Sequence, residues 1–497
     1  SVHVNVKADR NPISPYVYGA NVPTQHATAI RWGGNRTTTY NWETNYSNAG
    51  ADYFHTSDNY FTNNLSAQQR TIPGIAVINT VEQAKLRNQY SLITLQAAGY
   101  VAADNAGSVT EEQKAPSSRW NAVEFRKDSE LSLVPDKTDG KVYIDEFVNY
   151  LKHTLGQVGE GGVDGFGIDN EPALWASTHP YIRPNALSLD EFFYKTIEVG
   201  SVVKGIARKT EVFGPMFYGW NSMLRLSMDV YTDWSAIRTA KGYGWFVDFY
   251  LDSLAKVEQE YGKRILDVLA VHWYPEAKGT VTQKRIVNLD GTATEEQLIA
   301  EDMIAARLQA PRSLWDNTYV ENSWISQQAG AINIIGRLKQ SINTYYPGTK
   351  LAFTEFKYDA ENHFSGGLSL VDVLGVFGRE GVYMANKWDA TVGYAVSAYK
   401  MYLNYDGAGS KFGPISVQAE VDNNATLSSF ASVDEHGTLR LIVINKTATD
   451  KTTDFNLAGG YYTNALVYGF GQNNSEITAF DPVLSINDDA FTYTVPA

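Results

Sequence analysis

The chain of 497 residues contains no cysteine, which excludes disulfide bonds and thiolate sites. It also lacks any apolar run near the roughly 20 residues that cross a bilayer, and its longest apolar stretches, such as 265–271, have the length of buried strands. Its Lys and Arg residues form no basic block, and the formal net charge is −14. Because a nucleic-acid surface needs densely placed cations, we expect neither a membrane nor a nucleic acid as a partner.

Signatures of metal and nucleotide enzymes are missing as well. The eight His include no H-E-x-x-H cluster, so a catalytic zinc is not expected. The glycine-rich run "GEGGVDG" at 159–165 does not have the G-x-G-x-x-G spacing and precedes an apolar strand instead of a helix, so we interpret it as a plain loop. Catalysis is therefore expected to need no cofactor.

The first residues, "SVHVNVKADR", do not have the composition of a signal peptide. A secreted protein whose signal has been removed begins in this way, and so does a trimmed chain. We expect a secreted, extracellular protein that acts as a monomer.

Strand and helix patterns alternate between residues 12 and 403. Helical spacing, for example at Ile144, Phe147 and Leu151, separates short apolar stretches. We identify eight of them as strands: "YVYGA", "ATAIRW", "YSLITLQAAGYV", "GFGID", "EVFGP", "ILDVLAVHWYP", "KLAFTEF" and "VYMANKW". Strands separated by helices run parallel, so the pattern predicts an α/β protein with a closed (β/α)8 TIM-like barrel. An open doubly wound sheet is the alternative, but that fold usually carries a phosphate-binding glycine loop.

The pattern changes after residue 404. Short strand-like runs such as "LRLIVIN" and "NALVYGF" alternate with turns such as "DEHG" and "GQNN", and helical spacing is absent. Residues 404–497 are therefore predicted to form a β-sandwich domain beside the catalytic barrel of 12–403. The alternating strand "VHVNV" within residues 1–11 is expected to complete that sandwich. Because no low-complexity linker separates the two parts, we expect them to pack closely.

Acidic side chains end two of the predicted strands. In a parallel barrel, the carboxyl ends of the strands face the active-site mouth. The run "GFGIDNEPALW" places Asn170 and Glu171 at the end of the fourth strand, and "KLAFTEF" places Glu355 at the end of the seventh. These two strands face each other across a barrel, so the two carboxylates are expected to meet. A pair of carboxylates is what the cleavage of a glycosidic bond requires.

Other strand ends supply possible partners for these carboxylates. "HWYP" ends the sixth strand with His272 and Tyr274, and "AIRW" ends the second with Arg31. We expect Tyr274 to donate a hydrogen bond to the nucleophilic carboxylate and Arg31 to keep that carboxylate ionised. A purely structural hydrogen-bonding role is an equally good interpretation of Arg31 and His272.

Aromatic residues are abundant, with 31 Tyr and 11 Trp. Several Trp lie beside Gly, Asn or Pro in loop-like contexts, where flat faces can stack on sugar rings or on bases. The acidic charge of the chain favours the sugar, although core packing is the ordinary role of any single Trp. We predict a substrate groove formed by Trp32, Asn35, Trp42, Trp175, Trp324 and Trp388.

Taken together, the motifs "RWGGN" with "YNWE", "DNEPALW", "HWYP" and "TEF" resemble glycoside hydrolase family 44 of clan A, the endoglucanases and xyloglucanases. The resemblance implies a retaining mechanism with Glu171 as acid/base and Glu355 as nucleophile, and endo-acting hydrolysis of cellulose-like β-1,4-glucan or xyloglucan. Main activity on xylan or mannan remains an alternative within the clan. A polysaccharide-binding protein without hydrolytic activity is an alternative of another class.

The same resemblance implies a structural calcium ion near the loop "NWETNYSNAGADYFHTSD". Carboxylate oxygens of Glu43, Asp52 and Asp58 are its candidate ligands, with Asp145 as a further one. Their spacing is not that of an EF-hand, and acids in a polar loop are often simply solvated.

Overall fold

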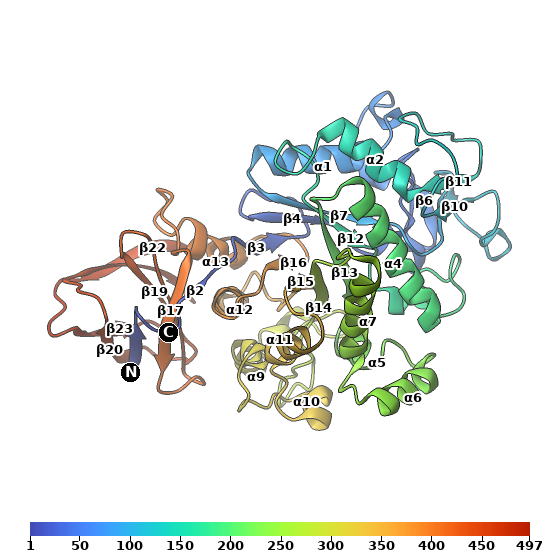
Figure 1. The fold of residues 1–497 in the computed structure, drawn as a ribbon. Coiled ribbons are helices and arrows are strands. Elements are labelled where there is room, and N and C mark those ends of the chain that lie inside the picture. The colour runs from blue at the N-terminus through green and yellow to red at the C-terminus, as the bar shows by residue number, and fades with distance from the viewer.

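The structure, a computed structural model, describes all residues from 1 to 497. Eight parallel strands form a closed barrel in the larger part of the molecule (Figure 1). In chain order they are β3 (Tyr16–Ala20), β4 (Ala29–Trp32), β7 (Tyr90–Leu95), β12 (Gly165–Ile168), β13 (Glu211–Phe217), β14 (Val268–Trp273), β15 (Lys350–Phe356) and β16 (Met384–Lys387). Each pairs with the next, and β16 closes the barrel against β3. The α/β barrel and its strand order are confirmed.

Helices cover the outside of the barrel and bury one apolar face against it. In α2 (Ile144–Leu155), Phe147, Val148 and Leu151 are buried, and the helix ends at Gly156, which has a φ of 89°. The other long helices between strands are α1 (Ile75–Leu86), α4 (Leu189–Ile206), α7 (Phe246–Tyr261), α11 (Ile334–Tyr345), α12 (Phe364–Arg379) and, after the last strand, α13 (Tyr394–Leu403). None of the helices combines the length and apolar composition that crossing a membrane requires.

Short elements occupy the connections between barrel strands and helices. The helices in these connections are α3 (Trp175–Thr178), α5 (Trp220–Arg225), α6 (Tyr231–Lys241), α8 (Glu295–Leu298), α9 (Glu301–Gln309) and α10 (Trp324–Ala329). The 3-10 helices are η1 (Asn35–Thr39), η2 (Gly50–Tyr53), η3 (Tyr60–Thr62), η4 (Gln69–Thr71), η5 (Glu111–Gln113), η6 (Pro172–Leu174) and η7 (Ala310–Leu314). There are two small sheets. One consists of β5 (Ser47–Asn48), β6 (Thr56–Asp58) and β9 (Gly107–Ser108), and the other of β8 (Tyr100–Ala102), β10 (Trp120–Glu124) and β11 (Lys141–Tyr143).

An all-β region follows α13. Its main sheet has the order β19-β18-β17-β1-β20-β23, and β2 pairs with β17. These strands are β1 (Val2–Asn5), β2 (Asn11–Pro12), β17 (Ile415–Val421), β18 (Leu427–Val433), β19 (Leu439–Asn445), β20 (Lys451–Ala458) and β23 (Ala490–Val495), and a separate hairpin joins β21 (Ala465–Gly471) to β22 (Asn474–Val483). Figure 1 shows these orange and red strands beside the barrel, with the blue N-terminal residues among them.

Strand β1 lies inside the main sheet, antiparallel to β17 and parallel to β20. Val2 and Val4 are buried while His3 is exposed, because successive side chains of a strand point to opposite faces. The N-terminal residues therefore pair with the C-terminal sheet and not with the barrel, which is the pairing expected for "VHVNV".

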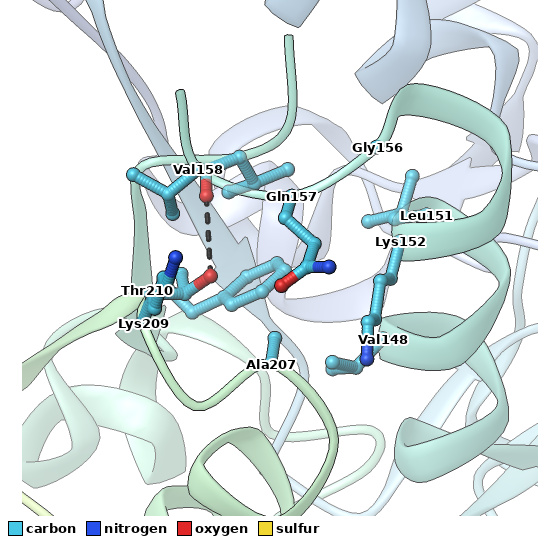
Figure 2. Close-up of a pocket in the computed structure, with 11 residues that line it drawn as sticks. Val148, Leu151, Lys152, Gly156, Gln157, Val158, Ala207, Lys209 and Thr210 are labelled. Atoms are coloured by element: carbon cyan, nitrogen blue, oxygen red, sulfur yellow. Dashed lines mark hydrogen bonds between the residues drawn. The ribbon is translucent and has the colours of Figure 1, made fainter. Parts of the chain in front are cut away.

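A small cavity lies near the amino ends of β12 and β13. Figure 2 shows it between α2 and the loops around Gln157 and Lys209. Its volume is about 20 Å³, and the Thr210 hydroxyl beside it donates to the Val163 carbonyl (3.2 Å). A space of this size holds about one water molecule, so it is not a substrate site.

Candidate active site

Glu171 follows β12, the fourth barrel strand, on a sharply turned backbone. Asp169 and Glu171 both have left-handed backbone angles, with φ of 54° and 43°, which non-glycine residues seldom adopt. The buried Asp169 carboxylate stabilises the turn, because it accepts hydrogen bonds from the Thr38 hydroxyl (2.6 Å) and from the amides of Ala97 (2.6 Å) and Asn170 (2.7 Å). Backbone strain that is held in this way is typical of functional sites.

Glu355 lies in β15, the seventh strand, and two donors hold its carboxylate. Arg31 of β4 donates from Nη1 to Oε1 (2.8 Å), and the Tyr274 hydroxyl, just past β14, donates to Oε2 (2.7 Å). Arg31 is fully buried and Glu355 is 5% exposed, so solvent screens their ion pair only weakly. The structure thus has both of the contacts that the strand ends suggest.

His272 lies between the two glutamates. It is paired with Glu355 in the β14–β15 ladder, directly after a shift in register. Its Nδ1 is 2.7 Å from Oε1 of Glu171 and 3.4 Å from Oε2 of Glu355. This nitrogen and one oxygen of each carboxylate all lie within 4.8 Å of one another. The two carboxylates therefore meet at one point of the barrel mouth.

The surroundings move the pKa values of the two carboxyl groups in opposite directions. Burial raises the pKa of Glu171, and the charge of Glu355 adds to this effect against the opposing influence of His272. Burial also acts on Glu355, but His272, Arg31 and Tyr274 together outweigh it and lower its pKa. A carboxyl group with a raised pKa beside one with a lowered pKa is the division of roles that acid catalysis with a nucleophile needs.

Two asparagines extend this network along the barrel mouth. Asn170 accepts a hydrogen bond from Arg31 Nη2 (2.7 Å), and its own Nδ2 donates to Oδ1 of Asn35 (3.0 Å). Asn35, which is half-buried, donates in turn to Asp52 (3.1 Å). Of the residues predicted to bind substrate, Asn35 is thus connected by hydrogen bonds to the ion pair of Arg31 and Glu355.

Two of the predicted groove tryptophans lie inside the protein. Trp42 is fully buried and stacks on Phe147 of α2, with 5.2 Å between the ring centroids. Trp175 is 3% exposed, and its Nε1 donates to the Asn170 carbonyl (2.8 Å). The prediction that they stack on substrate is wrong, because their ring faces are covered by the protein itself.

Trp32 is a third tryptophan that does not fit the predicted groove. It follows Arg31 in β4, and alternate side chains of a strand point to opposite faces. Since Arg31 reaches into the barrel mouth, the Trp32 ring faces the surrounding layer, where it packs edge-on against Tyr40 (4.9 Å) and contacts Phe61. Its predicted role in stacking is therefore corrected to core packing.

Trp388 and Trp324 are half-buried, so each keeps part of its side chain exposed. Trp388 directly follows β16, and its ring lies over Gly34, where any Cβ atom would come within 2.6 Å of the ring. Gly34 also has a φ of 96°, so this position requires glycine on two grounds. Trp324 begins α10 in the long connection between β14 and β15.

The four predicted calcium ligands do not form one group. Asp52 is hydrogen-bonded to Asn35, and Asp58 forms an ion pair with Arg36. Asp52 and Asp58 therefore have other partners. The prediction that Glu43, Asp52, Asp58 and Asp145 bind one ion together is wrong.

Glu43 and Glu146 are a better basis for a cation site. Glu43 is 1% exposed, and burial together with the charges of Asp139 and Glu146 raises its pKa to about 8. Oε2 of Glu43 and Oε1 of Glu146 are both buried without a hydrogen-bond partner. Asp145, beside Glu146, accepts hydrogen bonds from the amides of Lys127 (2.8 Å) and Glu146 (2.7 Å). Buried carboxylate oxygens without partners fit a hard cation such as Ca²⁺.

The sequence patterns single out neither Asp169 nor Glu146. Asp169 directly precedes Asn170 and Glu171 in "DNEP". Its position as an acid at the end of an apolar strand is a signal that could identify it. Glu146 lies within α2, far from Glu43 in the sequence, and no ligand spacing connects them. The packing of α2 against the loop at Trp42, where Phe147 stacks on the Trp42 ring, brings these two acids together.

The family model of glycoside hydrolase family 44 matches residues 46–277. Beta-mannanase/endoglucanase A of Caldicellulosiruptor saccharolyticus is 42% identical to this chain in an alignment that covers 100% of this chain. Endoglucanase A of Paenibacillus lautus is also 42% identical, in an alignment that covers 99% of this chain. The chain spans 38% of the length of the first relative and 70% of the length of the second.

A solved structure shows the same architecture. The Paenibacillus polymyxa xyloglucanase of family 44, determined with xyloglucan, matches 100% of this chain and 97% of its own, with a TM-score of 0.92 and 44% sequence identity. Identity and coverage at this level extend over both the barrel and the all-β region. The chain is a glycoside hydrolase and belongs to glycoside hydrolase family 44.

Proposed function

We propose that the chain is an endo-acting, retaining β-1,4-glucanase that hydrolyses xyloglucan or cellulose-like glucan. The observation that carries the mechanism is the spacing of Glu171 and Glu355, which have oxygens within 4.8 Å of each other. Retaining enzymes hold their carboxyl groups about 5–5.5 Å apart, whereas inverting enzymes leave about 6.5–9.5 Å for a water molecule. The relatives named endoglucanase and xyloglucanase support the substrate class.

Two displacements at the anomeric carbon follow from this geometry. In the first, Glu171 gives its proton to the glycosidic oxygen while the Glu355 carboxylate attacks the anomeric carbon and forms a glycosyl-enzyme ester. In the second, the Glu171 carboxylate takes a proton from a water molecule that attacks the same carbon, and Glu355 leaves. Arg31 and Tyr274 keep Glu355 ionised, and His272 holds the two carboxylates at a fixed separation.

A panel of soluble polysaccharides tests this function. We expect the chain to release reducing ends from xyloglucan or carboxymethylcellulose, with a rapid fall in viscosity because an endo-acting enzyme cuts inside the polymer. Mannan belongs in the panel, because one relative is named a mannanase as well as an endoglucanase. Binding of these polymers without any release of reducing ends would contradict the proposal and favour a binding protein.

We also propose a secreted monomer with two domains, a catalytic unit of 12–403 and a sandwich of 404–497 completed by 1–11. A polysaccharide is too large to enter a cell, which supports secretion. Arg31, Asn170, Glu171, His272, Tyr274 and Glu355 all come from one chain, so no second copy is needed to complete the site. Light scattering on the purified chain tests the monomer.

Trp388→Ala is expected to weaken the use of long substrates. Loss of one stacked aromatic costs about 1–3 kcal/mol for bases on aromatic side chains, and we expect a similar loss for a sugar ring. The KM for cello- or xyloglucan oligosaccharides should rise about 5- to 150-fold at unchanged melting temperature. Trp42→Phe is the matched control, because Trp42 is buried: it should lower the melting temperature and leave KM unchanged. Unchanged KM in Trp388→Ala would remove Trp388 from the binding groove.

A structural calcium ion is proposed at Glu43 and Glu146, with Asp145 adjacent. A ligand that binds only the folded state stabilises it by about 2.7 kcal/mol at one hundred times its Kd. A chelator should therefore lower the melting temperature of the wild type by several degrees, and calcium should restore it. Glu43→Gln should abolish this response, whereas Asp52→Asn should keep it. A wild-type melting temperature that ignores chelators would contradict the site and leave Glu43 as a protonated buried acid.

A further inference from the structure

The barrel ladder ends one residue before Tyr274. Strands β14 and β15 pair as far as Trp273 and Phe356, so no ladder bond fixes the backbone that carries the Tyr274 hydroxyl. The next residue, Pro275, has no amide hydrogen to contribute. The hydroxyl nevertheless lies 2.7 Å from Oε2 of Glu355, a placement that tolerates little movement of the backbone.

Arg285 supplies the missing backbone contacts. Its Nη2 donates to the Tyr274 carbonyl (2.5 Å) and its Nε to the Pro275 carbonyl (2.7 Å). Its remaining nitrogen, Nη1, lies 3.1 Å from a carboxylate oxygen of Glu276. The rigid, planar guanidinium thus fixes three consecutive residues of the segment that leaves the strand.

The segment that carries Arg285 is itself firmly anchored. The chain turns back after Pro275, and Arg285 forms an antiparallel bridge with Lys278. Ile286 and Val287, which follow, are buried in the main core, at 0% and 1% exposure. Arg307, fully buried, donates to the Ile286 carbonyl (3.2 Å). Arg285 therefore transmits the rigidity of the core to the end of β14.

We propose that Arg285 is a positioning residue for hydrolysis, which holds the backbone of Tyr274 and Pro275 so that the Tyr274 hydroxyl stays on the carboxylate of Glu355. Arg285 contacts neither carboxylate of the catalytic pair and acts through Tyr274 alone. The inference rests on the proposed role of Glu355 as the nucleophile.

The pH dependence of kcat/KM tests this inference. Glu355 must be ionised to act, so kcat/KM rises with pH through the pKa of Glu355, and this rise is the acid limb of the profile. Because the Tyr274 hydrogen bond favours the ionised carboxylate, it keeps the acid limb at low pH. Tyr274→Phe should move the acid limb to higher pH. Arg285→Met should move it in the same direction by about 0.5–1 pH unit, which lowers kcat/KM on that limb about 3- to 10-fold. Arg285→Lys, with a single ammonium group, should restore part of the shift.

Double substitution separates positioning from general loosening of the fold. If Arg285 acts through Tyr274, the acid limb of Arg285→Met/Tyr274→Phe should coincide with that of Tyr274→Phe alone. Arg337→Met is the matched control, because Arg337 makes the same kind of contact with the carbonyls of Ile332 (2.7 Å) and Ala331 (3.1 Å), before α11. It should leave the acid limb unchanged. An unshifted limb in Arg285→Met, or a further shift in the double variant, would overturn the inference.

A crystal structure of Arg285→Met gives a readout that does not depend on the catalytic role of Glu355. We expect the Tyr274 hydroxyl to move beyond hydrogen-bonding distance of Glu355, or its ring to become disordered. A retained separation of 2.7 Å would overturn the inference. If Glu355→Gln kept full activity, the proposed function would fail. The position of the Tyr274 hydroxyl in the Arg285→Met structure would still show whether Arg285 positions Tyr274.

Discussion

Glu355→Gln is expected to abolish hydrolysis of every substrate, whatever its leaving group. The neutral amide cannot form the glycosyl-enzyme ester, so we expect activity to fall by at least about 10³-fold, equivalent to about 4 kcal/mol in the activation free energy. The amide oxygen can still accept the hydrogen bond from Arg31, so the fold should be retained. Initial rates on xyloglucan and on an activated aryl glycoside, together with thermal melting, measure these effects.

Glu211→Gln is the matched control for this variant. Glu211 begins β13 at the opposite end of the barrel, where it accepts hydrogen bonds from the hydroxyls of Tyr90 and Tyr383 (2.6 Å each). Its substitution should lower the melting temperature and leave kcat close to that of the wild type. If Glu355→Gln retained more than a few per cent of wild-type activity while Glu211→Gln lost it, the assignment of the nucleophile would be wrong.

Glu171→Gln should affect substrates unequally. Positioned acid–base groups contribute about 10²–10⁴-fold to rate, so hydrolysis of polysaccharides should fall by about this factor. A dinitrophenyl glycoside needs no proton for departure of the phenolate, so its first step should remain fast. The second step should be slow, because the residue that activates water is missing. We therefore expect a burst of dinitrophenolate followed by slow turnover, and azide should restore turnover by forming a β-glycosyl azide.

The pH profile of the wild type should reflect both carboxyl groups. The pKa of Glu171 is raised by burial, so its proton is present at low pH and kcat/KM falls as pH rises through that pKa. The pKa of Glu355 is lowered, so the acid limb lies at lower pH than for an ordinary glutamate. Glu171→Gln should remove the basic limb and keep the acid limb. NMR of the first-formed product should show the β-anomer, and the α-anomer would contradict a retaining mechanism.

The catalytic pair could be predicted from the sequence because each member is tied to the end of a strand. In a parallel barrel the order of the strands decides which ends lie across the mouth from each other, and Glu171 follows the fourth strand while Glu355 lies near the end of the seventh. The details of their environment could not be predicted in the same way. The left-handed turn at Asp169 and Glu171 depends on hydrogen-bond donors that Thr38 and Ala97 supply to the Asp169 carboxylate from other segments of the chain.

The tryptophans show where local sequence is a poor guide. A Trp beside Gly or Asn looks like a loop residue, but burial depends on what packs over the loop, and for Trp42 this is Phe147 from a helix about a hundred residues later. Trp32 could have been assigned correctly, since Arg31 beside it points into the barrel mouth and strand alternation sends its neighbour the other way. Trp388 keeps its predicted place next to the mouth because it directly follows the last barrel strand.

The position of β1 has a consequence for how the chain is made. Residues Val2–Asn5 become an inner strand whose two neighbours begin much later in the chain, at Ile415 and Lys451. At about 5–20 residues per second, the ribosome needs on the order of 20–90 s to deliver those neighbours. In topological terms the barrel is an insertion between β1 and β2 of the sheet and the later strands that pair with them. The barrel is thus free to fold during translation, whereas the all-β region closes only when β17 and β20 pair with β1.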